Sequence, residues 1–155
     1  MSTAPEKHSI DNPDLARDRL RLWLQMLKAV RYVESTLREN LRTGYDTTLP
    51  RFDVLAALHA HPKGMTMSEL SKHLVVSNGN VTGVVDRIVK DGLAEREKLK
   101  SDRRAFRVKI SQNGRDLMDE LTAAHLGWID QLFANVSEAD AARAISIMLD
   151  IRHKK

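Results

Sequence analysis

The sequence contains no cysteine among its 155 residues. This absence excludes disulfides, zinc sites with thiolate ligands, thiol nucleophiles and peroxide sensing by cysteine. Aromatic residues make up only 5% of the chain, and no apolar run approaches the roughly 20 residues that a membrane-spanning helix needs. The first twelve residues do not combine a basic segment with a hydrophobic one, as a secretory signal would. We therefore expect a cytoplasmic protein with no membrane contact.

Positive charge is concentrated in the middle of the chain. Residues 63–110 contain eleven Lys and Arg against six Asp and Glu, although the net charge of the whole sequence is only +4. The segments before and after this block carry net charges of +1 and −2. Such a block is typical of a surface that contacts phosphates, but a solvated basic face explains the charge equally well. The length allows one domain and excludes a large two-domain enzyme.

The N-terminal third predicts one long helix. Residues 1–13 are polar and are expected to form a loose tail. From Asp14 to Thr43 apolar residues recur at helical spacing, and Gly44 is a suitable stop. Such a helix spans about 45 Å at the usual rise per residue. A monomer of this size cannot bury its whole apolar stripe, so we expect part of it to contact another chain.

Two further helices are predicted at the C-terminal end. Ser111 is expected to cap a long helix that carries Met118 and His125. Residues 136–140 form a capping box that opens a last helix over about 138–152. Its inner face is expected to bury Ile145, Met148 and Leu149.

Three shorter helices are predicted between these ends. Thr48 opens a helix over about 49–60, and Thr66 with Glu69 forms a capping box for a short helix that ends near Leu74. After only two residues, Ser77 is the expected N-cap of the next helix. Two short helices joined by so tight a turn predict a helix-turn-helix.

The second helix of this pair has an apolar and a polar face. Val81, Val85 and Ile88 share the apolar side, which predicts contact with the core. Asn pairs well with adenine, and Ser or Thr contacts bases or phosphates. Glycine inside a helix costs about 1 kcal/mol relative to alanine, so we interpret two glycines on the polar side as allowing close approach to a DNA groove, with a weak helix as the alternative. The polar side carries Gly79, Thr82, Gly83, Asp86 and Lys90, with Asn78, Asn80 and Arg87 at its edges.

After this helix, the spacing of the apolar residues changes from a period of 3.6 residues to one of 2, which predicts a β-hairpin. Residues 93–99 and 106–110 are its expected strands, with a turn at 100–102. A basic hairpin can place an arginine in a minor groove, whereas a solvated hairpin without DNA contact is the alternative. Asp102 is expected to orient a neighbouring guanidinium. The basic residues of the hairpin are Lys98, Lys100, Arg103, Arg104 and Arg107.

No motif of an enzyme is present. The sequence lacks G-x-x-x-x-G-K, G-x-S-x-G and H-E-x-x-H, so we expect neither catalysis nor a cofactor. His59 and His61 are two residues apart, a spacing that does not place two ligands side by side on a helix, and we expect no metal there.

Four segments together resemble the MarR family of bacterial transcription regulators. They are residues 65–74, the run SNGNVTGVVDRIVKDGL at 77–93, Asp102-Arg103-Arg104 and Ser111-Gln-Asn-Gly114. The resemblance covers nearly the whole chain. It implies a homodimeric winged helix-turn-helix repressor of a pseudo-palindromic DNA operator, with terminal helices that dimerise and a small-molecule pocket between them and the DNA-binding lobe. It further implies that Arg104 pairs with Asp86.

The expected fold is mainly α with a small β-hairpin wing, an α+β winged helix-turn-helix in one unit over 14–155. The DNA-binding lobe is expected over 48–112, and the dimerisation helices over 14–44 and 112–155. The sequence of residues 77–93 resembles branches of the MarR family that respond to an aromatic carboxylate or its CoA thioester. The expected DNA-binding residues are Ser77, Asn78, Asn80, Thr82, Gly83, Arg87, Lys98, Arg103 and Arg104, with Asp86 and Asp102 supporting the wing; the expected effector pocket is Trp23, Leu27, Val30, Arg31, Phe52, Leu55, His59, Met118 and His125.

One alternative of a different class remains at this stage. A helical interaction or scaffold protein would use the basic hairpin to bind an acidic protein or a membrane surface. For the apolar members of the expected pocket, ordinary core packing is also an alternative.

Overall fold

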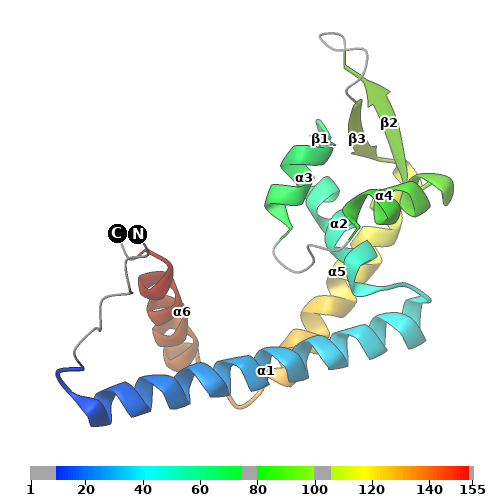
Figure 1. Ribbon diagram of the computed structural model, residues 1–155. Helices are drawn as coiled ribbons and strands as arrows, with labels where there is room; N and C mark the ends of the chain where they lie inside the picture. The colour runs from blue at the N-terminus through cyan, green and yellow to red at the C-terminus, as the bar shows by residue number, and fades with distance from the viewer. Residues whose placement is uncertain (1–9, 75–79, 100–105, 154–155) are drawn as a thin grey trace, which may run out of the picture.

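The computed structural model describes residues 10–74, 80–99 and 106–153. It is mostly helical, with one small antiparallel sheet (Figure 1). No described helix is both long and apolar enough to cross a membrane. In chain order the elements are α1 (Pro13–Tyr45), α2 (Leu49–Ala60), β1 (Met65–Thr66), α3 (Met67–His73), α4 (Val81–Lys90), β2 (Ala94–Lys98), β3 (Phe106–Ile110), α5 (Gln112–Leu132) and α6 (Glu138–Arg152).

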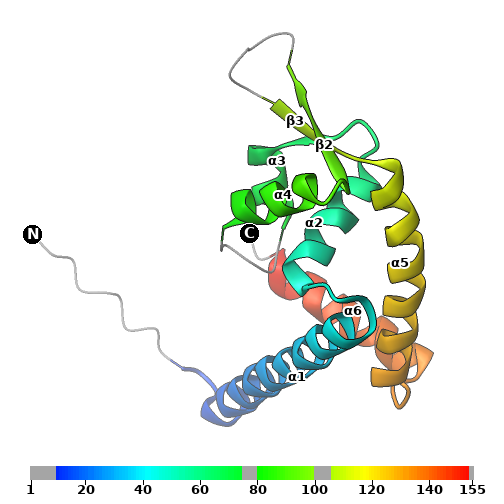
Figure 2. The same cartoon turned by 90° about the vertical axis from the view of Figure 1, so that its right-hand side faces the viewer.

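The elements form a compact lobe with helical arms. Figures 1 and 2 show α2, α3, α4 and the sheet gathered together, with α1 and α6 extending away from them. The helix α5 begins beside the sheet and runs toward α6. The chain thus has the mainly helical, winged architecture that the sequence predicts.

The core lies in the lobe around α2. Leu55 and Leu58 are fully buried there, and α2 packs on α4 and α5. Leu41 brings the end of α1 into this core, and Met118 and Leu121 bring in α5. The lobe is therefore the part of the chain that one copy can stabilise by burying apolar side chains.

The ends of the first two helices follow from their caps. Thr48 caps α2 through its side chain, as predicted, and α2 has the predicted bounds. Gly44 was expected to stop α1, but the helix continues to Tyr45. The cap is Asp46, whose φ of 46° is left-handed and whose N–H donates to Leu41 O. Aspartate tolerates this conformation better than most residues, which is why it replaces glycine here.

The sheet contains one strand that the sequence does not reveal. The strand order is β1–β3–β2, and both pairings are antiparallel. The predicted hairpin is confirmed as β2 and β3, with Ala94 opposite Ile110 and Lys98 opposite Phe106. The added strand β1 is only two residues long and pairs Met65 with Val108. So short a strand has no period that a sequence pattern can detect.

The last helix differs from its prediction in burial, not in position. Ser137 caps α6 at the predicted boundary by accepting from Asp140 N–H. The expected burial is wrong for the single chain: Ile145 is 60% exposed, Leu149 is 45% exposed, and no residue of α6 is buried. In one copy, the part of the chain that the structure describes leaves much of that apolar side uncovered.

The carboxyl group of Asp53 titrates close to neutral pH. The pKa of Asp53 is raised from 3.8 to about 6, mainly by burial and in part by the nearby Glu34, while Arg38 opposes the rise. The fold therefore binds this proton more tightly than the unfolded chain does. Ionising Asp53 therefore lowers the free energy of unfolding. This loss is absent below about pH 4 and complete above about pH 6.

Removing this charge should stabilise the protein only at the higher pH. Because Asp53 is partly exposed, we expect Asp53→Asn to raise the free energy of unfolding by about 1 kcal/mol near neutral pH. Near pH 4 (about the ordinary pKa of Asp) the variant and the parent should be equally stable. Urea unfolding at the two pH values measures the difference, and an equal gain at both would contradict the assignment.

Candidate nucleic-acid interface

The helix α4 begins later than the sequence predicts. Its N-cap is Asn80, not Ser77, and the Asn80 side chain accepts a 2.9 Å hydrogen bond from Gly83 N–H. Asn80 has a φ of 31°, a left-handed value that asparagine adopts more readily than most residues. Ser77 and Asn78 lie outside the described residues.

The two faces of α4 lie as predicted. Val85 and Ile88 are fully buried against the core, while Thr82 and Arg87 point outward with exposed side chains. Gly83 is half-buried. The side of α4 available to a nucleic acid is therefore polar and carries the positive charge of Arg87.

The packing around the N-cap of α4 favours glycine at position 83. A Cβ on Gly83 would lie 2.6 Å from Asn80 Nδ2 and 2.9 Å from Asn80 Cγ, closer than unbonded atoms pack. Glycine at this position therefore leaves room for the capping side chain. Close approach to a groove remains a prediction for Gly83, and Gly79, which precedes α4, lies outside the described residues.

The hairpin presents a charged outer surface. Lys98 is exposed at the end of β2, and Lys109 of β3 forms an ion pair with Glu97 of β2. Arg107 is half-buried and donates to Gly64 O at 3.2 Å. The remaining basic residues of the predicted wing, together with the predicted support Asp102, lie outside the described residues: Lys100, Asp102, Arg103 and Arg104.

An ion pair joins α4 to the hairpin. Arg96 of β2 donates from Nη2 to Asp86 Oδ1, and its guanidinium carbon lies 4.8 Å from the centre of the Phe106 ring. The expected partner of Asp86 was Arg104; among the described residues it is Arg96. Arg96 thus links the strand β2 to α4, and it is not among the residues predicted from the sequence, because the strand register is needed to place it beside α4.

We expect Asp86 and Arg96 to act on DNA affinity as a pair. Both side chains are partly exposed, so their pairing contributes at most about 1 kcal/mol. Asp86→Ala and Arg96→Ala should each weaken DNA binding about two- to fivefold. The double variant should be no weaker than either single one, because both remove the same contact. Fluorescence anisotropy with labelled DNA measures all four proteins; additive losses would contradict the coupling.

The predicted effector residues fall into two groups. The first lies where α2 meets α5: Phe52, Leu55 and Met118 are buried in the core. The ring of His125 stacks on Phe52 with centroids 4.7 Å apart, and burial lowers the pKa of His125, which favours its neutral form. His59 Nε2 lies 3.4 Å from Asp119 Oδ1.

The second group lies along α1. Trp23, Val30 and Arg31 are exposed, and Leu27 is half-buried. Trp23 lines a groove of about 540 Å³ together with Ile147 and Ile151 of α6. The chain therefore brings the predicted α2 and α5 residues together, but it leaves the α1 residues on an open surface.

The histidines considered for a metal have other contacts. His61 Nδ1 lies 2.8 Å from Ala57 O, and since a carbonyl only accepts, this nitrogen carries the proton. The ring of His61 meets that of His73 edge to face at 5.0 Å. Within residues 10–74, 80–99 and 106–153, no three His, Asp or Glu side chains are placed to hold a metal ion.

Comparison with known proteins identifies a consistent set of relatives. A sequence model of the MarR family matches residues 45–105. A MarR family transcriptional regulator from Silicibacter pomeroyi is 31% identical in sequence and superposes with a TM-score of 0.77. The match covers 90% of this chain and 96% of the regulator.

Two further relatives extend the comparison. A MarR family regulator from Streptomyces coelicolor, solved in complex with DNA, is 18% identical and has a TM-score of 0.78 over 96% of this chain and 90% of its own. The transcriptional repressor IacR from Pseudomonas putida is 24% identical over 97% of this chain and 90% of its own. The names of these relatives describe regulators of transcription and not enzymes.

Proposed function

This chain belongs to the MarR family of transcriptional regulators, and we propose that it is a ligand-responsive repressor that binds a pseudo-palindromic DNA operator as a homodimer. The observation that carries the proposal is the arrangement of α4 and the hairpin. The helix buries Val85 and Ile88, exposes Thr82 and Arg87, and is tied to the wing through Arg96. A polar helix face beside a basic hairpin suits a major groove with an adjoining minor groove.

The remaining predicted contacts extend this surface. Asn80, Lys98 and Gly83 border the same helix and hairpin, and Ser77, Asn78, Arg103 and Arg104 continue them in sequence. The Streptomyces coelicolor regulator, which has the same fold, was solved with DNA bound, and this supports the assignment. Because bacterial operators lie in the cytoplasm, we place the protein there.

The homodimer is supported by the apolar faces that one chain leaves open. Leu20, Trp23 and Leu24 of α1 are 46–56% exposed, and Ile145 and Leu149 of α6 are also exposed. Exposing this much apolar surface is unfavourable in water. A second copy would cover both faces, which assigns 14–44 and 112–155 to dimerisation and 48–112 to the DNA-binding lobe.

The proposed effector is an aromatic carboxylate or its CoA thioester. We place it where α2 meets α5, beside the stacked Phe52 and His125 and the pair of His59 with Asp119. Leu55 and Met118 are buried in the core between these helices, and Trp23, Leu27, Val30 and Arg31 would approach from an α1 helix. An effector that prefers dimers with misplaced α4 helices lowers operator affinity by its difference in binding free energy.

Binding to DNA selected from a random-sequence pool tests the proposal. We expect Arg87→Ala to weaken binding to the selected site about tenfold and to flatten the salt dependence by about one phosphate contact. Lys63→Ala, on the side of the lobe opposite Lys90 of α4 and outside both dimerisation segments, is the matched control and should bind as the parent does. Aromatic acids and CoA thioesters are then added to the complex, and at least one should release the DNA. Failure to select any sequence would overturn the proposal.

A further inference from the structure

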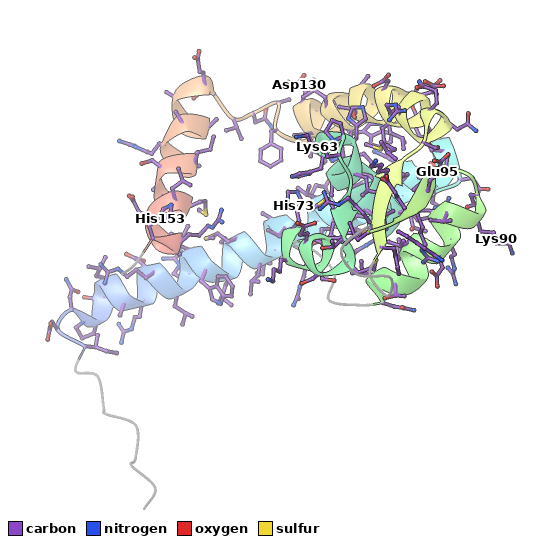
Figure 3. All side chains as sticks on the ribbon, turned by 90° about the horizontal axis from the view of Figure 1, so that it is seen from above. Lys63, His73, Lys90, Glu95, Asp130 and His153 are labelled. Atoms are coloured by element: carbon purple, nitrogen blue, oxygen red, sulfur yellow. The ribbon has the colours of Figure 1, made fainter. Side chains whose placement is uncertain are left out.

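A second cavity lies on the compact lobe, away from the proposed effector residues. It has a volume of about 500 Å³ and is bordered by the end of α2, by β1, by the first turn of α3 and by β3. Figure 3 shows Lys63, on its wall, and His73, beside it, on the same side of the lobe, opposite Lys90 and Glu95. None of the nine residues predicted for the effector pocket lines it.

The wall of this cavity is held in place by backbone contacts around Gly64. Gly64 has a φ of 79°, and its N–H donates to His61 O at 2.8 Å. A Cβ there would lie 2.6 Å from Val108 O, so only glycine fits between the loop and β3. The pairing of Met65 with Val108 fixes the next residue along the wall. The cavity is therefore formed by the fold and not by loosely placed side chains.

The charges around the cavity are unequal. The Arg107 guanidinium has five N–H donors and uses one of them on Gly64 O. Lys63 forms no ion pair with any residue that the structure describes. The one carboxylate on the wall, Glu69, already accepts from Thr66 N–H at 2.7 Å, and these bonds hold the pKa of Glu69 below its ordinary value. Two cations thus face the cavity with one anion, Glu69, which caps α3 and also interacts electrostatically with Arg107.

Apart from these charged residues, His61 and the backbone of Gly64, the lining is apolar. Ala60, Pro62 and Met65 contribute carbon surface, and the stems of Lys63 and Arg107 add to it. A volume of about 500 Å³ lies within the range of pockets that bind small molecules. A bare inorganic anion would leave this apolar surface unused.

We propose that this cavity binds a small amphipathic anion, whose carboxylate pairs with Arg107 and Lys63 and whose apolar body packs on Ala60, Pro62 and Met65. Arginine suits a carboxylate because its planar donors bind both oxygens. The ligand would contact β3 of the wing and the first turn of α3 at once. Its site is separate from the proposed effector pocket, and its existence does not depend on DNA binding.

Titration of the isotope-labelled full chain with benzoate, followed by NMR, tests the proposal. Benzoate should move the signals of Gly64 and His61 and saturate them. Lys63→Gln and Arg107→Gln should each weaken binding about tenfold or more, because each removes a charged partner. Lys72→Gln, an exposed lysine of α3 that does not line the cavity, is the matched control and should bind benzoate as the parent does.

Two further probes separate the possible ligands. Benzamide has the same apolar body without the charge and should bind at least about tenfold more weakly than benzoate. Inorganic phosphate has the charge without the body and should also bind more weakly. Phosphate binding as tight as that of benzoate would overturn the proposal in favour of a site for a phosphodiester.

Three other outcomes would also overturn it. They are the absence of saturable shifts at Gly64, unchanged benzoate affinity in Lys63→Gln, and shifts confined to His125 and Phe52. The last result would place benzoate at the proposed effector pocket and leave the proposed function intact. Because Lys63 takes no part in the hydrogen bonds among the described residues, Lys63→Gln remains informative even if Arg107→Gln fails to fold.

Discussion

Replacing Leu149 with aspartate is expected to separate the proposed dimer into single chains. Leu149 lies on the exposed apolar side of α6, where the fold of one chain leaves it 45% accessible. In a dimer it would be covered, and a buried unpaired carboxylate costs several kcal/mol. The variant should sediment as a 17.6 kDa chain, whereas the parent should have twice that mass.

The same change should abolish tight operator binding. Two joined lobes bind two half-sites with a high effective concentration, and single lobes lose that gain, which is worth about 100-fold or more. Ser146→Asp adds the same charge to the polar side of α6, beside Arg143 and Asp150, and should leave both mass and affinity unchanged. A Leu149→Asp protein that remains dimeric, or that binds DNA normally as a monomer, would contradict the proposed assembly.

Replacing Gly114 with alanine should strongly destabilise the lobe. Gly114 is buried in the first turn of α5, where its N–H donates to Ser111 Oγ. A Cβ there would lie 2.1 Å from Leu93 O and 2.7 Å from Ile110 Cγ1. Since these are a backbone carbonyl and a core side chain, neither can move without disturbing the sheet. We expect the free energy of unfolding to fall by about 3 kcal/mol or more.

A second glycine of the same helix is the control. Gly127 has open space around its Cα, so an added methyl group meets nothing within 4 Å. Gly127→Ala should stabilise α5 by up to about 1 kcal/mol through helix propensity alone. Urea unfolding of the two variants against the parent measures both effects. Equal stabilities for Gly114→Ala and Gly127→Ala would contradict the packing described for Gly114.

The sequence predicted the elements well because their signals are local. The caps Thr48, Thr66, Ser111 and Ser137 each open a helix at the predicted residue, since a cap needs only a side chain and an amide three residues later. The prediction of Ser77 as the cap of α4 is wrong, because the cap is Asn80, which lies closer to the apolar face. Residue preference alone does not choose between two capable side chains so close together.

The candidate site was less predictable because it depends on distant pairs. Arg96 meets Asp86 only through the packing of α4 against the sheet, and the cavity at Gly64 depends on the register of β1 with β3. The burial expected of Ile145 failed because a helical period marks an apolar face but does not say which molecule covers it. Which distant residues meet, and which molecule covers an apolar face, becomes known only from the three-dimensional arrangement.

The proposed function requires sequence-specific binding of double-stranded DNA through α4. Footprinting of the purified protein on the DNA upstream of its own gene tests it most directly. We expect two protected half-sites about one helical turn (~34 Å) apart, and Arg87→Ala should need about tenfold more protein to protect either of them. Uniform protection without preference for any sequence, or a footprint that Arg87→Ala leaves unchanged, would contradict the account.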